Sequence, residues 1–162
     1  MLKRVYPLLI ALMLMSCGGD EPTISSSVNL DVQTTLSLIN SHRAAGAECG
    51  ADTKVSVPGL KWDNALAKAA LGHSNDMQQK GYFSHTGQNG STFSQRVEAA
   101  GFEGIPMGEN IAAGYPDEEA VITGWMNSEG HCKNIMNGDA THVGVARSAE
   151  GSLWTMVLGR KQ

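Results

Sequence analysis

The residues SEGHCKNIM, at positions 128–136, place an acid, a histidine and a cysteine within four consecutive positions. Three kinds of chemistry suit these residue types. Glu129 and His131 could bind a metal ion, Cys132 could be a nucleophile beside His131, or Cys132 could be one end of a structural disulfide. The rest of the chain has to distinguish these three possibilities.

The start of the chain predicts an exported lipoprotein. Two basic residues precede the apolar stretch 7–15, which is too short to span a bilayer. It ends in LMSC, which resembles the lipobox of bacterial lipoproteins, where the signal peptide is cut before a cysteine that then carries lipid. The resemblance implies a signal peptide over 1–16 and a lipidated Cys17 followed by a flexible tether over 17–33. An ordinary secretory signal with a spare cysteine is the alternative.

Charge restricts the partners that we expect. The formal net charge is −4 and no run of basic residues occurs, which argues against nucleic-acid binding. Membrane contact would therefore come through the acyl chains on Cys17. Gly18 stands where an Asp commonly signals inner-membrane retention in Gram-negative lipoproteins, so its presence favours the outer membrane. We expect a monomer.

Export also bears on the two remaining cysteines. With Cys17 lipidated, Cys49 and Cys132 form an even pair in an oxidising compartment. A disulfide between them would close a long loop, worth roughly 4 kcal/mol in the chain-entropy model. Neighbouring residues on a helix point about 100° apart, so His131 is poorly placed to activate Cys132. We therefore favour the disulfide over the nucleophile.

Helices and strands follow from periodicity and capping signals. Helices are predicted over about 34–45 and over 60–81, the second with Asp63 as N-cap and Gly81 at its end. A third helix is predicted from a Thr92–Gln95 capping box through Ala100. A fourth is predicted from 117–119 onward, and a helix or turn from Gly130 through Met136. Residues 46–59 are expected to be irregular and 108–114 to be extended or loop. Strands are predicted at 141–148 and 152–159 with a turn between them. This order indicates an α+β layered domain.

The apolar face of the 60–81 helix includes a histidine. His73 falls in line with Leu66 and Met77, so we expect it on the buried face. A buried histidine alone is more often a core residue bonded to a backbone carbonyl than a ligand.

Six segments in order resemble the bacterial CAP superfamily, which takes its name from cysteine-rich secretory proteins, antigen 5 and pathogenesis-related proteins. They are HSNDM (73–77), YFSHTGQNGSTFSQRVEAAGF (82–102), GENIAAGY (108–115), GWMNSEGHCKNIMN (124–137), HVGVA (142–146) and LWTMVLG (153–159). The resemblance covers Leu36 to Gly159, within a domain predicted over 34–162. It implies a three-layer α-β-α sandwich of the SCP type with a shallow cavity on one side.

The same resemblance implies a set of cavity residues. Two histidines and two acids line the family's cavity and in several members hold a divalent metal, often zinc. His73, Glu109 and His131 match three of these positions. The fourth gives Ser128, where eukaryotic members have an acid and bacterial relatives usually have serine. The resemblance therefore implies that His73, Glu109 and His131 could bind a divalent metal ion as cofactor, with zinc as the expected metal.

Each candidate also has a plainer interpretation. Glu109 can bond to backbone N–H groups of its own loop, and the three groups can satisfy one another without metal. Glu129 follows a candidate N-cap at Ser128, where the helix dipole favours an anion, and we prefer that interpretation. The same dipole would disfavour protonation of His131. Ser84 and His85 could contact a substrate, although turn stabilisation is commoner for such residues.

Three functions remain open at this stage. We favour a binding module of the cell envelope whose His/Glu cavity, with Ser128 and His85 at its border, holds a divalent metal or a small or lipid ligand. The alternative is a metal-assisted, protease-like hydrolase that uses metal-bound water, or Glu109 as base with His73 or His131. No HExxH motif or Ser/His/Asp order supports this alternative. A structural or adhesive surface domain is the third possibility.

Overall fold

The computed structural model describes residues 28–161. The predicted signal peptide and Cys17 lie outside the described residues. The folded part begins before residue 34, where the sequence predicts the domain to start. Val28 is buried in the core, and the first helix starts at Val32 with Asp31 as its N-cap.

Five helices and six strands occur between Val28 and Lys161. The helices are α1 (Val32–Ala45), α2 (Asn64–Lys80), α3 (Phe93–Ala99), α4 (Glu118–Met126) and α5 (Glu129–Ile135). The strands are β1 (Ala47–Cys49), β2 (Asp52–Lys54), β3 (Lys61–Trp62), β4 (Ile105–Ala113), β5 (His142–Arg147) and β6 (Leu153–Arg160).

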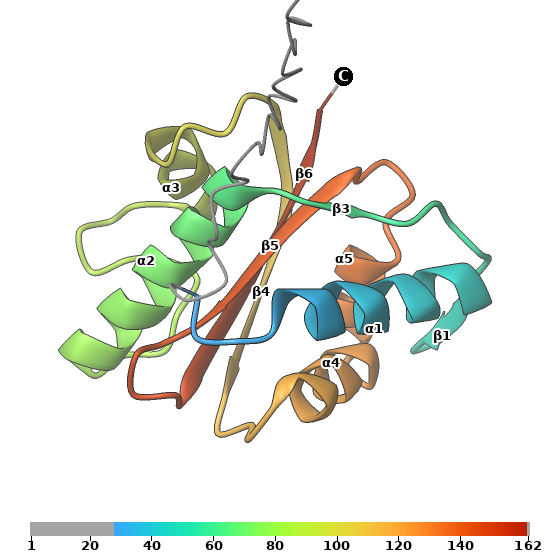
Figure 1. Ribbon diagram of the computed structural model, residues 1–162, viewed down its shortest axis with the longest axis horizontal. Helices are drawn as coiled ribbons and strands as arrows, with labels where there is room; N and C mark the ends of the chain where they lie inside the picture. The colour runs from blue at the N-terminus through green and yellow to red at the C-terminus, as the bar shows by residue number, and fades with distance from the viewer. Residues whose placement is uncertain (1–27, 162) are drawn as a thin grey trace, which may run out of the picture.

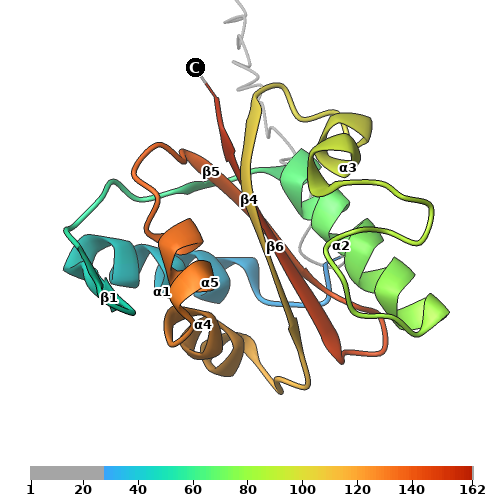
Figure 2. The ribbon, with the colours of Figure 1, turned by 180° about the vertical axis from the view of Figure 1, so that it is seen from behind.

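These elements form three layers. Helices α2 and α3 cover one face of a four-stranded sheet, and α1, α4 and α5 cover the other (Figures 1 and 2). The sheet order is β3-β5-β6-β4. The outer pair β3–β5 is parallel, whereas β5–β6 and β6–β4 are antiparallel. The predicted α+β sandwich is therefore confirmed.

Alternation along the strands divides the core between the two faces. Trp154, Met156 and Leu158 of β6 pack with the α1, α4 and α5 side, and Val157 packs with the α2 and α3 side. Gly144 of β5 allows α2 to pack closely against the sheet. A Cβ there would lie 2.0 Å from the backbone nitrogen of Ala67, so α2 rests directly on the strand.

Capping signals in the sequence locate the helices well. Asp63 accepts from Ala65 N and Leu66 N at the start of α2, and Gly81 ends that helix in the left-handed conformation. The Thr92–Gln95 capping box is present in full at the start of α3. The strands predicted at 141–148 and 152–159 are β5 and β6, and they pair as a hairpin.

Two expectations need correction. Residues 46–59 are not wholly irregular, because Ala47–Cys49 pairs with Asp52–Lys54 around a turn where Gly50 has φ +65. Strands of three residues are too short to show an alternating pattern, so this hairpin leaves no periodic signal. The helix predicted over 60–81 begins only at Asn64, because Lys61–Trp62 forms strand β3 ahead of the Asp63 N-cap. The segment 108–114, expected to be extended or loop, is indeed extended, and all of it except Gly114 lies within strand β4.

Candidate functional site

A buried carboxylate lies at the centre of the site. Glu109 projects from β4, and its side chain is only 2% exposed. One oxygen, Oε1, accepts a hydrogen bond from His85 Nδ1 at 2.9 Å. The other, Oε2, accepts from an Arg96 guanidinium nitrogen at 2.7 Å. Both carboxylate oxygens are thus held by side chains from other elements, as a buried charge requires.

Arg96 connects the loop before α3 to this carboxylate. The capping box fixes the first turn of α3, and Arg96 lies on the next turn. Besides Glu109, its guanidinium donates to the carbonyl oxygens of Ser91 and His85. Arg96 therefore fixes both the carboxylate and the loop that carries His85.

His85 is the exposed member of the group. Its side chain is 55% exposed, in the loop between α2 and α3. Because Nδ1 faces a carboxylate, Nδ1 is the nitrogen that carries the proton in the neutral form of the ring, and in that form Nε2 has the lone pair. Glu109 thereby orients the imidazole and leaves Nε2 available at the surface.

His73 lies beneath this group on α2 and is 1% exposed. Its Nε2 is 2.9 Å from the carbonyl oxygen of Ser84 and 4.0 Å from Glu109 Oε1. Burial lowers the pKa of His73, although the charge of Glu109 acts in the opposite direction. The ring is accordingly neutral, and it supports the 82–91 loop through a backbone carbonyl.

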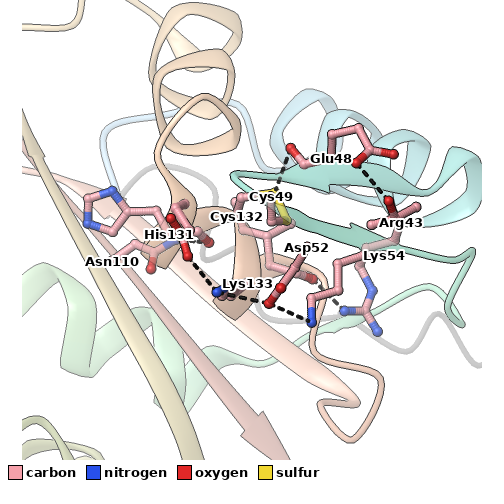
Figure 3. Close-up of a disulfide and its surroundings, with 12 residues drawn as sticks. Arg43, Glu48, Cys49, Asp52, Lys54, Asn110, His131, Cys132 and Lys133 are labelled. Carbon is pink, nitrogen blue, oxygen red and sulfur yellow. Dashed lines mark hydrogen bonds and ion pairs between the residues drawn. A yellow bond between two sulfur atoms is a disulfide. The ribbon is translucent and has the colours of Figure 1, made fainter.

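His131 reaches the site from α5. Burial, and to a lesser extent the charge of His85, lowers its pKa, so the predicted resistance to protonation has burial rather than the helix dipole as its main cause. Its backbone carbonyl accepts from Asn110 Nδ2 at 3.1 Å, which ties α5 to β4. Figure 3 shows the His131 ring pointing away from the neighbouring disulfide.

The predicted disulfide is present. Cys49 of β1 and Cys132 of α5 are bonded, with their Cα atoms 5.4 Å apart. Both residues are fully buried. This confirms that Cys132 is structural, and it excludes the nucleophile interpretation because a disulfide sulfur has no thiolate to offer. Figure 3 shows the bond joining the β1–β2 hairpin to α5.

Glu129 and Ser128 lie at the start of α5. Ser128 occupies the N-cap position but makes no side-chain capping bond. Glu129 is the first residue of the helix, and its carboxylate accepts from Lys133 Nζ at 2.6 Å. Lys133 also contacts Asp52 at 2.9 Å. Glu129 thus stands at the helix start, as predicted. It also belongs to an ion-pair group facing the β1–β2 hairpin, which the sequence did not indicate.

The metal-ligand set predicted from the sequence fits a metal poorly in this geometry. The Arg96 cation lies against Glu109, and Nε2 of His73 is engaged by Ser84. Across residues 28–161, no group of three or more His, Cys, Asp or Glu side chains is arranged to hold a metal ion. Zinc binding at His73, Glu109 and His131 stays a prediction.

Arg96 is the site residue that the sequence reasoning missed. A buried acid such as Glu109 requires a cation or several hydrogen-bond donors. That requirement was the signal that could have pointed to a basic partner for Glu109. Arg96 also stands in the segment YFSHTGQNGSTFSQRVEAAGF that carries the resemblance. Spacing along the chain does not reveal that the two residues meet, since they lie on different elements.

Comparison with known proteins gives relatives of the same domain. The chain is 38% identical to the uncharacterized protein YkwD of Bacillus subtilis over 80% of this chain and 47% of that protein. It is 44% identical to the uncharacterized membrane protein YlbC of the same organism over 53% of this chain and 25% of that protein. The chain thus spans about half or less of the curated relatives that it matches.

Solved structures agree with this fold. An extracellular protein containing an SCP domain from Bacillus anthracis matches with a TM-score of 0.70 and 35% identity, over 80% of this chain and 40% of that chain. An outer surface protein from Borrelia burgdorferi matches with a TM-score of 0.66 over 80% of this chain and 92% of that chain, and its 20% identity supports the fold alone. The model of the cysteine-rich secretory protein family, CAP, matches residues 36–158. The chain belongs to the CAP family.

Proposed function

We propose that this protein is a binding module of the cell envelope that contacts its ligand through the imidazoles of His85 and His131. The observation that carries this proposal is the enclosure of Glu109 between His85 and Arg96. The carboxylate is used within the protein, so it orients His85 instead of meeting a ligand itself.

The two histidines suit one ligand site. When His85 is protonated, its charge contributes to the lowered pKa of His131, after the larger effect of burial. Since burial keeps His131 neutral, its ring can accept a hydrogen bond or donate a lone pair to a metal. A ligand with hydrogen-bonding groups, or a divalent metal such as zinc held by these two nitrogens, fits this pair.

An envelope location is part of the proposal. The lipobox-like LMSC predicts attachment through Cys17, and the similar B. anthracis protein is described as extracellular. Within residues 28–161, no helix is long and apolar enough to cross a membrane. A lipid anchor at Cys17 would hold the module at the membrane surface, and Gly18 favours the outer membrane in a Gram-negative cell.

Calorimetry with two probes, Zn²⁺ and palmitate, tests the binding proposal on the full chain. We expect at least one probe to bind at a single saturable site, and that binding to be lost in His85→Ala and in His131→Ala. His42→Ala is the matched control, because His42 lies on α1 and outside the Glu109 cluster. It should leave binding unchanged.

The outcomes separate the hypotheses. Equal heats in wild type and in both site variants, or no heat with either probe, would contradict the binding proposal. If the variants changed only the thermal stability, the structural or adhesive interpretation would replace it. Binding of Zn²⁺ that is lost in His73→Ala but kept in His85→Ala would restore the ligand set predicted from the sequence.

A hydrolase is the second candidate function, and one contact favours it. The 2.9 Å contact between Glu109 and His85 resembles a general-base dyad in which His85 would activate a water molecule. A fluorogenic peptide library incubated with wild type, His85→Ala and Glu109→Gln tests this. Turnover that both variants abolish would establish the hydrolase, and equal background in all three proteins would exclude it for peptides.

A further inference from the structure

Two adjacent residues of β4 point to opposite faces of the sheet. Glu109 pairs with Val157 of β6, and Val157 packs on the α2 and α3 side. Asn110 pairs with Met156, which packs on the side of α1, α4 and α5. Cross-strand partners share a face, so Glu109 is directed into the α2 and α3 layer and Asn110 toward α5. The two neighbours therefore contact the two helical layers between which the sheet lies.

Asn110 uses both ends of its side-chain amide on α5. It is fully buried, and its Nδ2 donates to the backbone carbonyl oxygen of His131 at 3.1 Å (Figure 3). Its Oδ1 accepts from Asn134 Nδ2 at 2.8 Å. An amide donates through its nitrogen and accepts through its oxygen, so this one side chain satisfies two groups of α5. Because buried polar groups without partners are unfavourable, the bonds favour one position of α5 against β4.

Asn134 completes the link from the side of the helix. Its Nδ2 also lies 3.3 Å from the backbone carbonyl oxygen of Glu109. Gly108 leaves room for this side chain, because a Cβ there would lie only 3.1 Å from the Cγ and Oδ1 atoms of Asn134. Within residues 28–161, the hydrogen bonds between β4 and α5 all involve Asn110 or Asn134.

The other contacts of α5 connect it to different elements. Cys132 joins it to the β1–β2 hairpin, and Arg43 of α1 donates to the carbonyl oxygen of Ile135. Ile135 also packs in the core, but apolar contacts are not directional. The two amides are therefore the directional contacts that fix α5 relative to the strand carrying Glu109.

We propose that Asn110, supported by Asn134, is a positioning residue for His131. Glu109 orients the ring of His85 on one face of the sheet, and Asn110 fixes on the other face the backbone from which the His131 ring projects. This inference rests on the proposed function, because it assigns Asn110 a role in the ligand site built on His85 and His131. Such a site requires its groups to be held within about 0.5 Å of the productive geometry.

Three alanine variants of the full chain test the role of Asn110. Asn110→Ala removes both bonds to α5. Asn134→Ala breaks the same link from a partly buried position, so it serves if Asn110→Ala does not fold. Asn40→Ala is the matched control, because the Asn40 amide likewise bridges two segments. On α1, it donates to the carbonyl oxygen of Leu60 at 3.0 Å and accepts from the Leu60 N–H at 2.7 Å.

Crystal structures of the variants measure the position of the His131 ring relative to the Glu109 carboxylate. We expect a displacement of about 0.5 Å or more in Asn110→Ala and Asn134→Ala, and none in Asn40→Ala. His85 should keep its bond to Glu109 in all three. Calorimetry then uses whichever of Zn²⁺ and palmitate binds the wild type. Its affinity should fall about 10- to 100-fold in the two site variants, as when a group that orients a metal ligand is removed, and stay unchanged in Asn40→Ala.

Several results would overturn the positioning role. One is a His131 ring that stays in place in a folded site variant, and another is unchanged affinity in a variant whose ring has moved. An equal loss of affinity in Asn40→Ala would show that general destabilisation is the cause. If neither probe binds the wild type, the binding proposal fails, and the ring positions alone then decide whether Asn110 positions His131.

Discussion

At the scale of single residues, Arg96 and Glu109 form the most sensitive contact of the site. A buried charge that has lost its partner is far more costly than the intact pair is favourable. Glu109 is 2% exposed and cannot reach water to compensate. Removing the charge of one residue should therefore lower the free energy of unfolding more than removing both charges.

Arg96→Met leaves the Glu109 carboxylate buried with only His85 as donor. We expect it to lower the free energy of unfolding by about 3–5 kcal/mol, as breaking buried pairs does. Urea denaturation monitored by tryptophan fluorescence measures this. The double variant Arg96→Met with Glu109→Gln should recover part of the loss, because no charge remains buried. A single-variant effect as small as that of an exposed ion pair would contradict the buried-pair description.

At the scale of elements, the Cys49–Cys132 bond holds α5 against the β1–β2 hairpin. Lys133 reinforces this contact through Asp52 and Glu129, but those side chains are largely exposed and contribute little. A buried arginine fixes the other end of α5. Arg43, fully buried on α1, donates to the carbonyl oxygens of Ile135 and Asn137.

Replacing both cysteines, Cys49→Ser with Cys132→Ser, should lower the free energy of unfolding by about 4 kcal/mol, because the bond closes a long loop in the unfolded chain. Differential scanning calorimetry of the variant and of the oxidised wild type measures it. The exposure of His131 should increase as well, which diethyl pyrocarbonate labelling detects. Unchanged stability would mean that the hairpin and Arg43 suffice to hold α5.

Sequence reasoning succeeded for elements with local signals. Asp63, Gly81 and the Thr92–Gln95 box each act within one helical turn, so a linear pattern contains them. The disulfide followed from counting cysteines. The contact of Arg96 with Glu109 was missed because it depends on how distant elements pack. His73 is buried and bonded to a backbone carbonyl, as its plainer interpretation predicts, but identifying that carbonyl as Ser84 requires the path of the loop.

At the scale of the whole molecule, one buried and two partly buried histidines make stability depend on pH. Burial lowers the pKa values of His73, His131 and His142 below 6.5, their ordinary value. The unfolded chain therefore binds more protons than the folded protein once the pH falls below about 6.5. Their contribution to stability is fully present above that pH and is lost as the pH falls toward the folded pKa values.

We therefore expect urea midpoints to fall between pH 7.5 and pH 5.0. The carboxyl groups with lowered pKa values, such as Asp63, titrate in the unfolded chain near 3.8, so most of their effect lies at lower pH. His73→Gln should reduce the slope in this range. A midpoint that stays constant over the range, or rises toward pH 5.0, would show that these histidines are not held neutral.

The order of strands in the sheet has a consequence for how the molecule is made. The strand at 153–160, last in the chain among those described, lies between its neighbours in the middle of the sheet and not at an edge. A chain that emerges N-terminus first, from a ribosome or through a membrane, can form its helices early but cannot join the two halves of the sheet until these residues have emerged. Shortening the chain before residue 153 would thus remove the central strand and prevent folding of the whole domain.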